Sequence, residues 1–131
     1  MPKRVYIETY GCQMNVADSE LLFGLLDREG YVRADEPAGA DVMLVNTCAV
    51  RDNAEQRVIG RMGELQRHKR PGDVLGIVGC MAQRLGPALL DQVPRVDLVA
   101  GPDAYRNLAA LVAQAGSGQR VSDTEFRSWE H

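Results

Sequence analysis

The sequence predicts an α/β fold, a flavodoxin-like doubly wound parallel sheet of about five strands with helices on both faces, in a Rossmann-like three-layer sandwich. Two observations support this class. Short apolar, β-branched runs alternate with helical patterns along the chain, which is typical of parallel βα units. The length of 131 residues suits one domain rather than two. A Rossmann-type half of a larger domain is the second architecture that fits this alternation.

The first third of the chain predicts two strands around one amphipathic helix. "VYIET" at residues 5–9 is the first strand, and a short strand follows near "YVRA" at 31–34. Between them, residues 15–30 predict a helix with Asn15 as its N-cap and Gly30 at its end. Its buried face is predicted from residues at i, i+3, i+4 spacing, which are Leu21, Leu22, Leu25 and Leu26.

The middle third predicts two fully buried strands joined by the clearest helix. "DVMLVN" at 41–46 and "VLGIVG" at 74–79 are nearly continuous apolar runs, as expected of strands covered on both faces. Residues 52–72 predict the helix, where Asp52 and Glu55 resemble a capping box. Its apolar stripe is predicted to consist of Ala54, Val58, Met62 and Leu65.

The last third predicts a short helix at 84–94, a strand at 96–101 and a final helix at 103–116. The remaining residues, 117–131, show no periodicity and are expected to be a linker. We therefore expect one domain over residues 1–116.

Composition excludes several classes of protein. The net charge of −3 and the pI near 5.3 give no general electrostatic footprint for nucleic acid. No apolar run approaches the roughly 20 residues of a membrane span, and the first residues lack a signal-peptide pattern, so we expect a cytoplasmic protein with no membrane partner. Three cysteines in such a compartment are not a disulfide framework.

The three cysteines occupy equivalent places in the predicted fold. Cys12, Cys48 and Cys80 follow the first, third and fourth predicted strands. In the strand order 2-1-3-4-5 those strands are neighbours, and three adjacent strand ends span about 10 Å. Ligand sites of open parallel sheets gather at these carboxyl ends. The three thiols are therefore expected to converge on one small object.

Several kinds of site fit three thiols. Cysteine often only packs in a core, and a structural zinc site normally takes four ligands, whereas His68 and His131 are poorly placed to add one. There is no C-x-x-C for a redox dithiol. A 4Fe–4S cluster held by three thiolates, with one iron left open, fits better, because a helix N-terminus is predicted after each cysteine. Gly11 and Gly79 would let the backbone approach such a ligand, or they serve ordinary turns.

Three motifs resemble a known family. "TYGCQMNVADSE", "NTCAVRDNAEQRV" and "GCMAQR" followed by "VDLVAG" are similar to the N-terminal domain of the methylthiotransferases, which are radical S-adenosylmethionine enzymes with a second, auxiliary cluster. The resemblance runs from about residue 7 to about residue 101. The residues after the first two cysteines most resemble the branch that converts isopentenyladenosine beside the tRNA anticodon to its 2-methylthio form.

The resemblance assigns roles to particular residues. It implies that Cys12, Cys48 and Cys80 ligate the auxiliary 4Fe–4S cluster, which supplies or holds the transferred sulfur. Four flanking residues would lie near the cluster or the substrate, or make turn and capping hydrogen bonds instead: Gln13, Asn15, Asn46 and Arg51.

The resemblance also implies what the chain lacks. The family's C-x-x-x-C-x-x-C triplet for the radical-generating cluster and its C-terminal RNA-binding domain are absent. Residues 117–131 would then lead toward a missing radical S-adenosylmethionine domain, and this fragment alone would be inactive. In the full enzyme, a second 4Fe–4S cluster and S-adenosylmethionine are the further cofactors and tRNA is the partner. A monomer is expected.

Other functions remain open from sequence. The chain could belong to the branch that modifies a ribosomal-protein aspartate. It could instead be a flavodoxin-like binding domain whose cysteines merely pack, or a small redox sensor with reactive thiols. A simple nucleotide site is disfavoured because "YGCQMN" lacks the G-x-G-x-x-G fingerprint.

Overall fold

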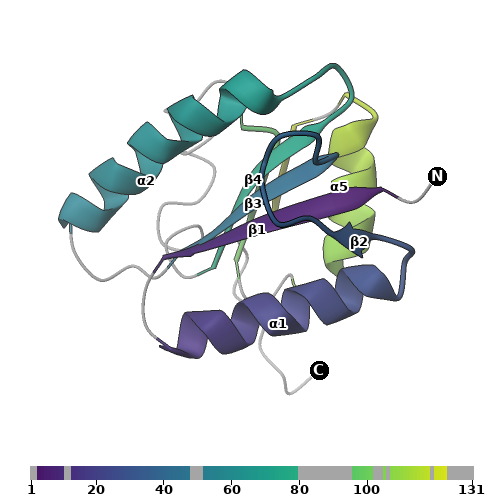
Figure 1. Ribbon diagram of the computed structural model, residues 1–131, viewed down its shortest axis with the longest axis horizontal. Coiled ribbons are helices and arrows are strands. Elements are labelled where there is room, and N and C mark those ends of the chain that lie inside the picture. The colour runs from purple at the N-terminus through teal and green to yellow at the C-terminus, as the bar shows by residue number, and fades with distance from the viewer. Residues whose placement is uncertain are drawn as a thin grey trace.

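A computed structural model describes residues 3–10, 13–47, 52–79, 96–101, 105, 107–118 and 120–123 (Figure 1). The elements, in chain order, are β1 (Arg4–Tyr10), α1 (Gln13–Asp27), β2 (Val32–Arg33), β3 (Val42–Thr47), α2 (Asp52–Leu65), the 3-10 helix η1 (Gln66–His68), β4 (Val74–Gly79), β5 (Leu98–Ala100), α5 (Leu108–Gly116) and β6 (Val121–Asp123).

All strand pairs are parallel, and the sheet order is β2-β1-β3-β4-β5-β6. The predicted doubly wound α/β class is therefore confirmed, and so is the order 2-1-3-4-5. The sheet has a sixth strand, β6, inside the segment that we expected to be a linker. Residues 121–123 form no apolar run, so the sequence did not predict this strand. Backbone hydrogen bonds hold it in the sheet, and Val121 N–H donates to Asp97 O at 2.8 Å.

Helices cover both faces of the sheet, and each face has its own core. The α1 and α5 side is packed from residues such as Leu22, Leu44 and Leu108. The opposite side, covered by α2, is packed from residues such as Met43 and Met62. Successive residues of β3 alternate between the two cores, so the strand is buried along its whole length. Figure 1 shows α2 and α1 on opposite sides of the central strands.

The α2 stripe is confirmed at Val58, Met62 and Leu65, which are all buried. The expected buried face of α1 is only partly right. Leu22 and Leu26 are fully buried, but Leu21 is 53% exposed. Leu22 and Leu26 are four residues apart and share the face that lies on the sheet, Leu25 is partly buried beside them, and Leu21 is turned about 100° from Leu22 toward solvent.

Two helix starts also differ from expectation. Helix α1 begins at Gln13, so Asn15 lies inside its first turn and is not the N-cap. Helix α5 begins at Leu108, with Asn107 as its N-cap, rather than near residue 103. The helix expected at 84–94 and the glycine at position 11 lie outside the described residues.

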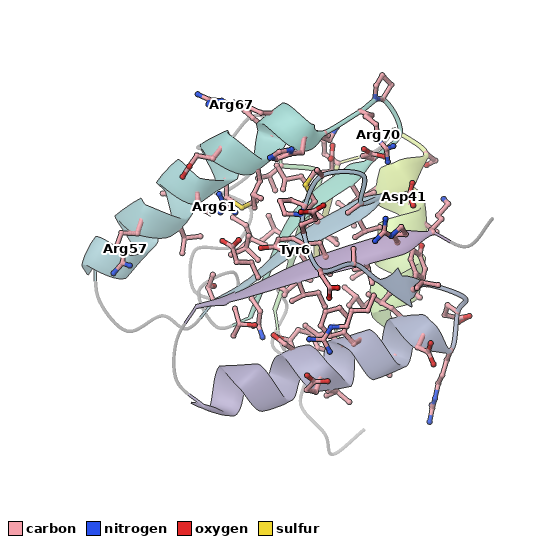
Figure 2. All side chains as sticks on the ribbon, viewed as in Figure 1. Tyr6, Asp41, Arg57, Arg61, Arg67 and Arg70 are labelled. Atoms are coloured by element: carbon pink, nitrogen blue, oxygen red, sulfur yellow. The ribbon has the colours of Figure 1, made fainter. Side chains whose placement is uncertain are left out.

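The amino edge of the sheet is organised by three aspartates that directly precede β3, β4 and β5. Asp41, Asp73 and Asp97 each accept a backbone N–H, at 2.8, 2.9 and 3.0 Å respectively. Lys69 forms an ion pair with Asp97 at 3.3 Å, and Arg70 forms ion pairs with both other aspartates. Figure 2 shows Arg70 and Asp41 together at this end of the molecule. The strand starts are thus fixed independently of the strand ends.

In the described part of the chain, no helix is long and apolar enough to cross a lipid bilayer.

Substitution Gly76→Ala tests how closely the central strands are packed. An added Cβ at Gly76 would lie 2.9 Å from Leu44 Cδ2 and 3.1 Å from Leu98 Cβ. We expect a loss of about 1–3 kcal/mol in the free energy of unfolding, because overpacking forces neighbours to move. Urea unfolding measures this loss.

The matched control is Gly60→Ala on α2, where a Cβ would meet nothing within 4 Å. It should stabilise the protein by up to about 1 kcal/mol, since alanine favours helix. Equal effects at the two glycines would contradict the packing argument.

Candidate functional site

The carboxyl ends of three neighbouring strands are aligned in the sheet. Tyr10 on β1 is the register partner of Thr47 on β3, which is in turn the partner of Gly79 on β4. In Figure 1 the ends of β1 and β3 and the first turns of α1 and α2 lie at the same end of the molecule. Parallel pairing thus places three chain exits side by side, about 5 Å apart from strand to strand.

The three cysteines follow these exits directly in sequence. Cys12 comes two residues after Tyr10, while Cys48 and Cys80 each come one residue after the end of their strand. All three lie outside the described residues. The predicted adjacency of their strands is confirmed, and their role as ligands stays a prediction.

Asn46, one of the predicted flanking residues, is fully buried at the end of β3. Its Nδ2 donates a hydrogen bond to Ser19 Oγ of α1 at 3.0 Å. The Ser19 hydroxyl lies 2.6 Å from Thr9 Oγ1, and Thr9 is the register partner of Asn46 on β1. The three side chains thus form one neutral network that joins α1 to the ends of β1 and β3.

Gly79 brings the end of β4 against the same asparagine. Its φ of +105° lies in the region that favours glycine. An added Cβ there would lie 2.8 Å from Asn46 Oδ1 and would overlap the Thr47 carbonyl oxygen. Close approach to the protein's own neighbouring strand therefore explains this glycine without a ligand.

The other predicted flanking residues are less defined. Gln13 and Asn15 lie in the first turn of α1, directly after Cys12 in sequence. Arg51 lies outside the described residues. Among the residues that the structure describes, no group of three or more His, Cys, Asp or Glu could hold a metal ion.

A polar cluster on the α2 face was not predicted from sequence. Arg61 of α2 donates to both carboxylate oxygens of Glu8, with distances of 2.9, 2.9 and 3.1 Å. Tyr6 Oη donates to Glu8 Oε1 at 2.6 Å. Figure 2 shows Arg61 on α2 and Tyr6 on β1. The sequence signal was a glutamate inside a predicted strand, two residues after a tyrosine on the same face.

The environment of Tyr6 raises its pKa. Burial raises the pKa of Tyr6 above its ordinary value of 10.0, and the hydrogen bond and negative charge of Glu8 raise it further. Arg61 opposes this rise in pKa but does not overcome it. Tyr6 is a hydrogen-bond donor at neutral pH. The Arg61–Glu8 ion pair joins α2 to β1 two residues before the strand ends at Tyr10.

Substitution Arg61→Met tests this attachment. The side chains of Arg61 and Glu8 are 29% and 16% exposed, so the pair is partly shielded from water. We expect a loss of about 1.5–3 kcal/mol in the free energy of unfolding, as for hydrogen bonds to charged groups. The control is Glu64→Gln, which removes a 3.8 Å contact of a 63% exposed side chain. It should change stability by less than about 0.5 kcal/mol, and a similar effect of both variants would contradict the assignment.

Tyr6 should also make stability depend on alkaline pH. Because its pKa is raised in the folded state, its contribution is complete below about pH 10 and is lost as pH rises through the raised value. We expect the unfolding free energy of the native protein to fall more steeply above about pH 10 than that of Tyr6→Phe. Tyr31, whose pKa is also raised, should maintain a smaller slope in the variant. Identical slopes in urea unfolding would refute this prediction.

Comparison with known proteins identifies the family. Residues 4–101 match the family described as "Uncharacterized protein family UPF0004". Curated relatives named "tRNA-2-methylthio-N(6)-dimethylallyladenosine synthase" are 48% identical in Amoebophilus asiaticus, 42% in Chlorobium phaeobacteroides and 44% in Porphyromonas gingivalis. These matches cover 93%, 99% and 98% of this chain, but only 26%, 30% and 28% of the respective relatives. The resemblance to methylthiotransferases found in the three cysteine motifs is thereby confirmed, and the chain belongs to the UPF0004 family.

Proposed function

We propose that this chain is the auxiliary cluster-binding part of a tRNA methylthiotransferase. The observation that carries the proposal is the aligned end of β1, β3 and β4, from which the chain runs into Cys12, Cys48 and Cys80 within two residues. Three thiols attached to points about 5 Å apart suit a 4Fe–4S cluster, which proteins hold through cysteine thiolates. The names of the relatives support the same class of enzyme.

Two of the chain's helices favour the thiolate form of Cys12 and Cys48. Helix α1 begins one residue after Cys12, and α2 begins four residues after Cys48. Backbone N–H groups at a helix N-terminus stabilise negative charge and lower thiol pKa values. Three protein ligands leave one iron of the cluster open. When bound, the cluster supplies or holds the sulfur that the whole enzyme transfers.

The remaining chemistry belongs to the rest of the enzyme. Because this chain spans 26% to 30% of its relatives, we propose that a radical S-adenosylmethionine domain with a second 4Fe–4S cluster lies elsewhere in the whole protein. An RNA-binding domain would then hold the tRNA, and this part alone would not turn over. We propose a cytoplasmic, monomeric enzyme acting on isopentenyladenosine beside the anticodon. The relatives' names support this substrate over a ribosomal protein.

Anaerobic reconstitution with iron and sulfide tests the proposal. We expect about four irons and four sulfides per chain, as in one 4Fe–4S cluster. Each of Cys12→Ser, Cys48→Ser and Cys80→Ser should lose the cluster and its visible absorption, because the three thiolates serve one site.

The control measurement is the melting temperature of each variant without iron, which should change little if the thiols are not core residues. Full iron retention by any one variant would remove that cysteine from the ligand set. Failure of the native chain to take up iron, with all three thiols inert to alkylation, would favour the alternative of a flavodoxin-like domain with packing cysteines.

A further inference from the structure

Asn46 is a fully buried polar side chain on a strand face that is otherwise apolar. Its neighbours on the same face of β3, Val42 and Leu44, are buried members of the apolar core. A buried amide costs free energy unless its hydrogen bonds are made. A buried amide whose hydrogen bonds are made differs from a leucine because its partners must lie at a defined distance and direction, and such networks specify one arrangement of the core.

Asn46, at the end of β3, is connected through Ser19 to the end of β1 and lies close to the end of β4. Its Nδ2 donates to Ser19 Oγ at 3.0 Å, and through Ser19 it is connected to Thr9 on β1. On the other side, its Oδ1 lies where a Cβ of Gly79 would be only 2.8 Å away. Asn46 thus links β3 to α1 through Ser19, which itself contacts Thr9 of β1, and it lies close to the end of β4. These contacts come one to three residues before the three cysteines in sequence.

We propose that Asn46, together with Ser19 and Thr9, is a positioning group that holds the three cysteine-bearing strand ends at the spacing needed for a shared metal cluster. The inference rests on the proposed function of the cysteines. Among the described residues, the last register pairs of these strands are Tyr10 with Thr47 and Thr47 with Gly79. In the network, Thr9 and Asn46 lie one residue before the ends of β1 and β3. Ser19 lies on α1, seven residues after Cys12, and so connects the network to the helix that follows this cysteine.

The test uses Cd²⁺ as a probe of the thiols, because thiolate–Cd²⁺ absorption in the ultraviolet counts the bound sulfurs without iron chemistry or enzyme activity. The 131-residue chain is titrated under anaerobic, reducing conditions. Thr9→Val removes the hydroxyl and keeps the side-chain shape, and Asn46→Leu removes the amide. We expect each to weaken Cd²⁺ binding by about 10- to 100-fold, as substitutions behind metal ligands do.

Two controls separate positioning from general stability. Thr9→Ser retains the hydroxyl and should restore the native affinity for Cd²⁺. Asp97→Ala loses the Leu75 N–H bond and the Lys69 ion pair at the opposite edge of the sheet. It should lower the melting temperature and leave the affinity unchanged. If Asn46→Leu does not fold, the comparison of Thr9→Val with Thr9→Ser still decides.

The outcomes distinguish this inference from the proposed function. A native chain that binds Cd²⁺ through three thiolates, with Thr9→Val and Asn46→Leu binding equally well, overturns the inference alone. An equal loss of affinity in Asp97→Ala also overturns it, because stability would then be the cause. A native chain without a three-thiolate site overturns both the proposed function and the inference.

Discussion

The parallel pairing of β1, β3 and β4 is the constraint on which the candidate site depends. Register runs from Val5, Val42 and Val74 at one edge to Tyr10, Thr47 and Gly79 at the other, without interruption where the strands pair. Cysteines more than 30 residues apart in sequence are therefore attached to adjacent points of one edge. A slip of one residue in any strand would turn its side chains to the other face and displace its exit from this row.

The two edges of the sheet are held by different chemistry. At the amino edge, Asp41, Asp73 and Asp97 accept backbone N–H groups and pair with Lys69 and Arg70. At the carboxyl edge on the α1 side, the network is neutral, with Asn46 and Ser19 buried and Thr9 partly buried. Charge pairs near water tolerate small movements, whereas a buried amide–hydroxyl network has one geometry that satisfies it. The aspartates thus stabilise the starts of the strands, whereas the Asn46, Ser19 and Thr9 network would set the distances between the strand ends.

Much of this arrangement could be predicted from sequence, for reasons that differ by element. Strand β4 was predicted at its observed bounds, Val74–Gly79, because a strand covered on both faces is apolar throughout. Strand β6 and the Glu8–Arg61 pair were not, since both depend on partners far away in the chain. Asn46 was singled out beside Cys48, but only the structure shows that it points into the protein toward Ser19.

The proposed role of Asn46 is to couple the ends of β1, β3 and β4. A side chain at Gly79 would overlap the Thr47 carbonyl oxygen and also lie 2.8 Å from Asn46 Oδ1, and the amide of Asn46 is hydrogen-bonded to Ser19 of α1. Under the proposal, a disturbance at the end of β4 would therefore affect the helix that follows Cys12. The proposed ligands follow three separate strands, which backbone pairing aligns as far as Tyr10, Thr47 and Gly79. Under the proposal, Asn46 adds a side-chain link between these strand ends and α1, and this link carries no charge.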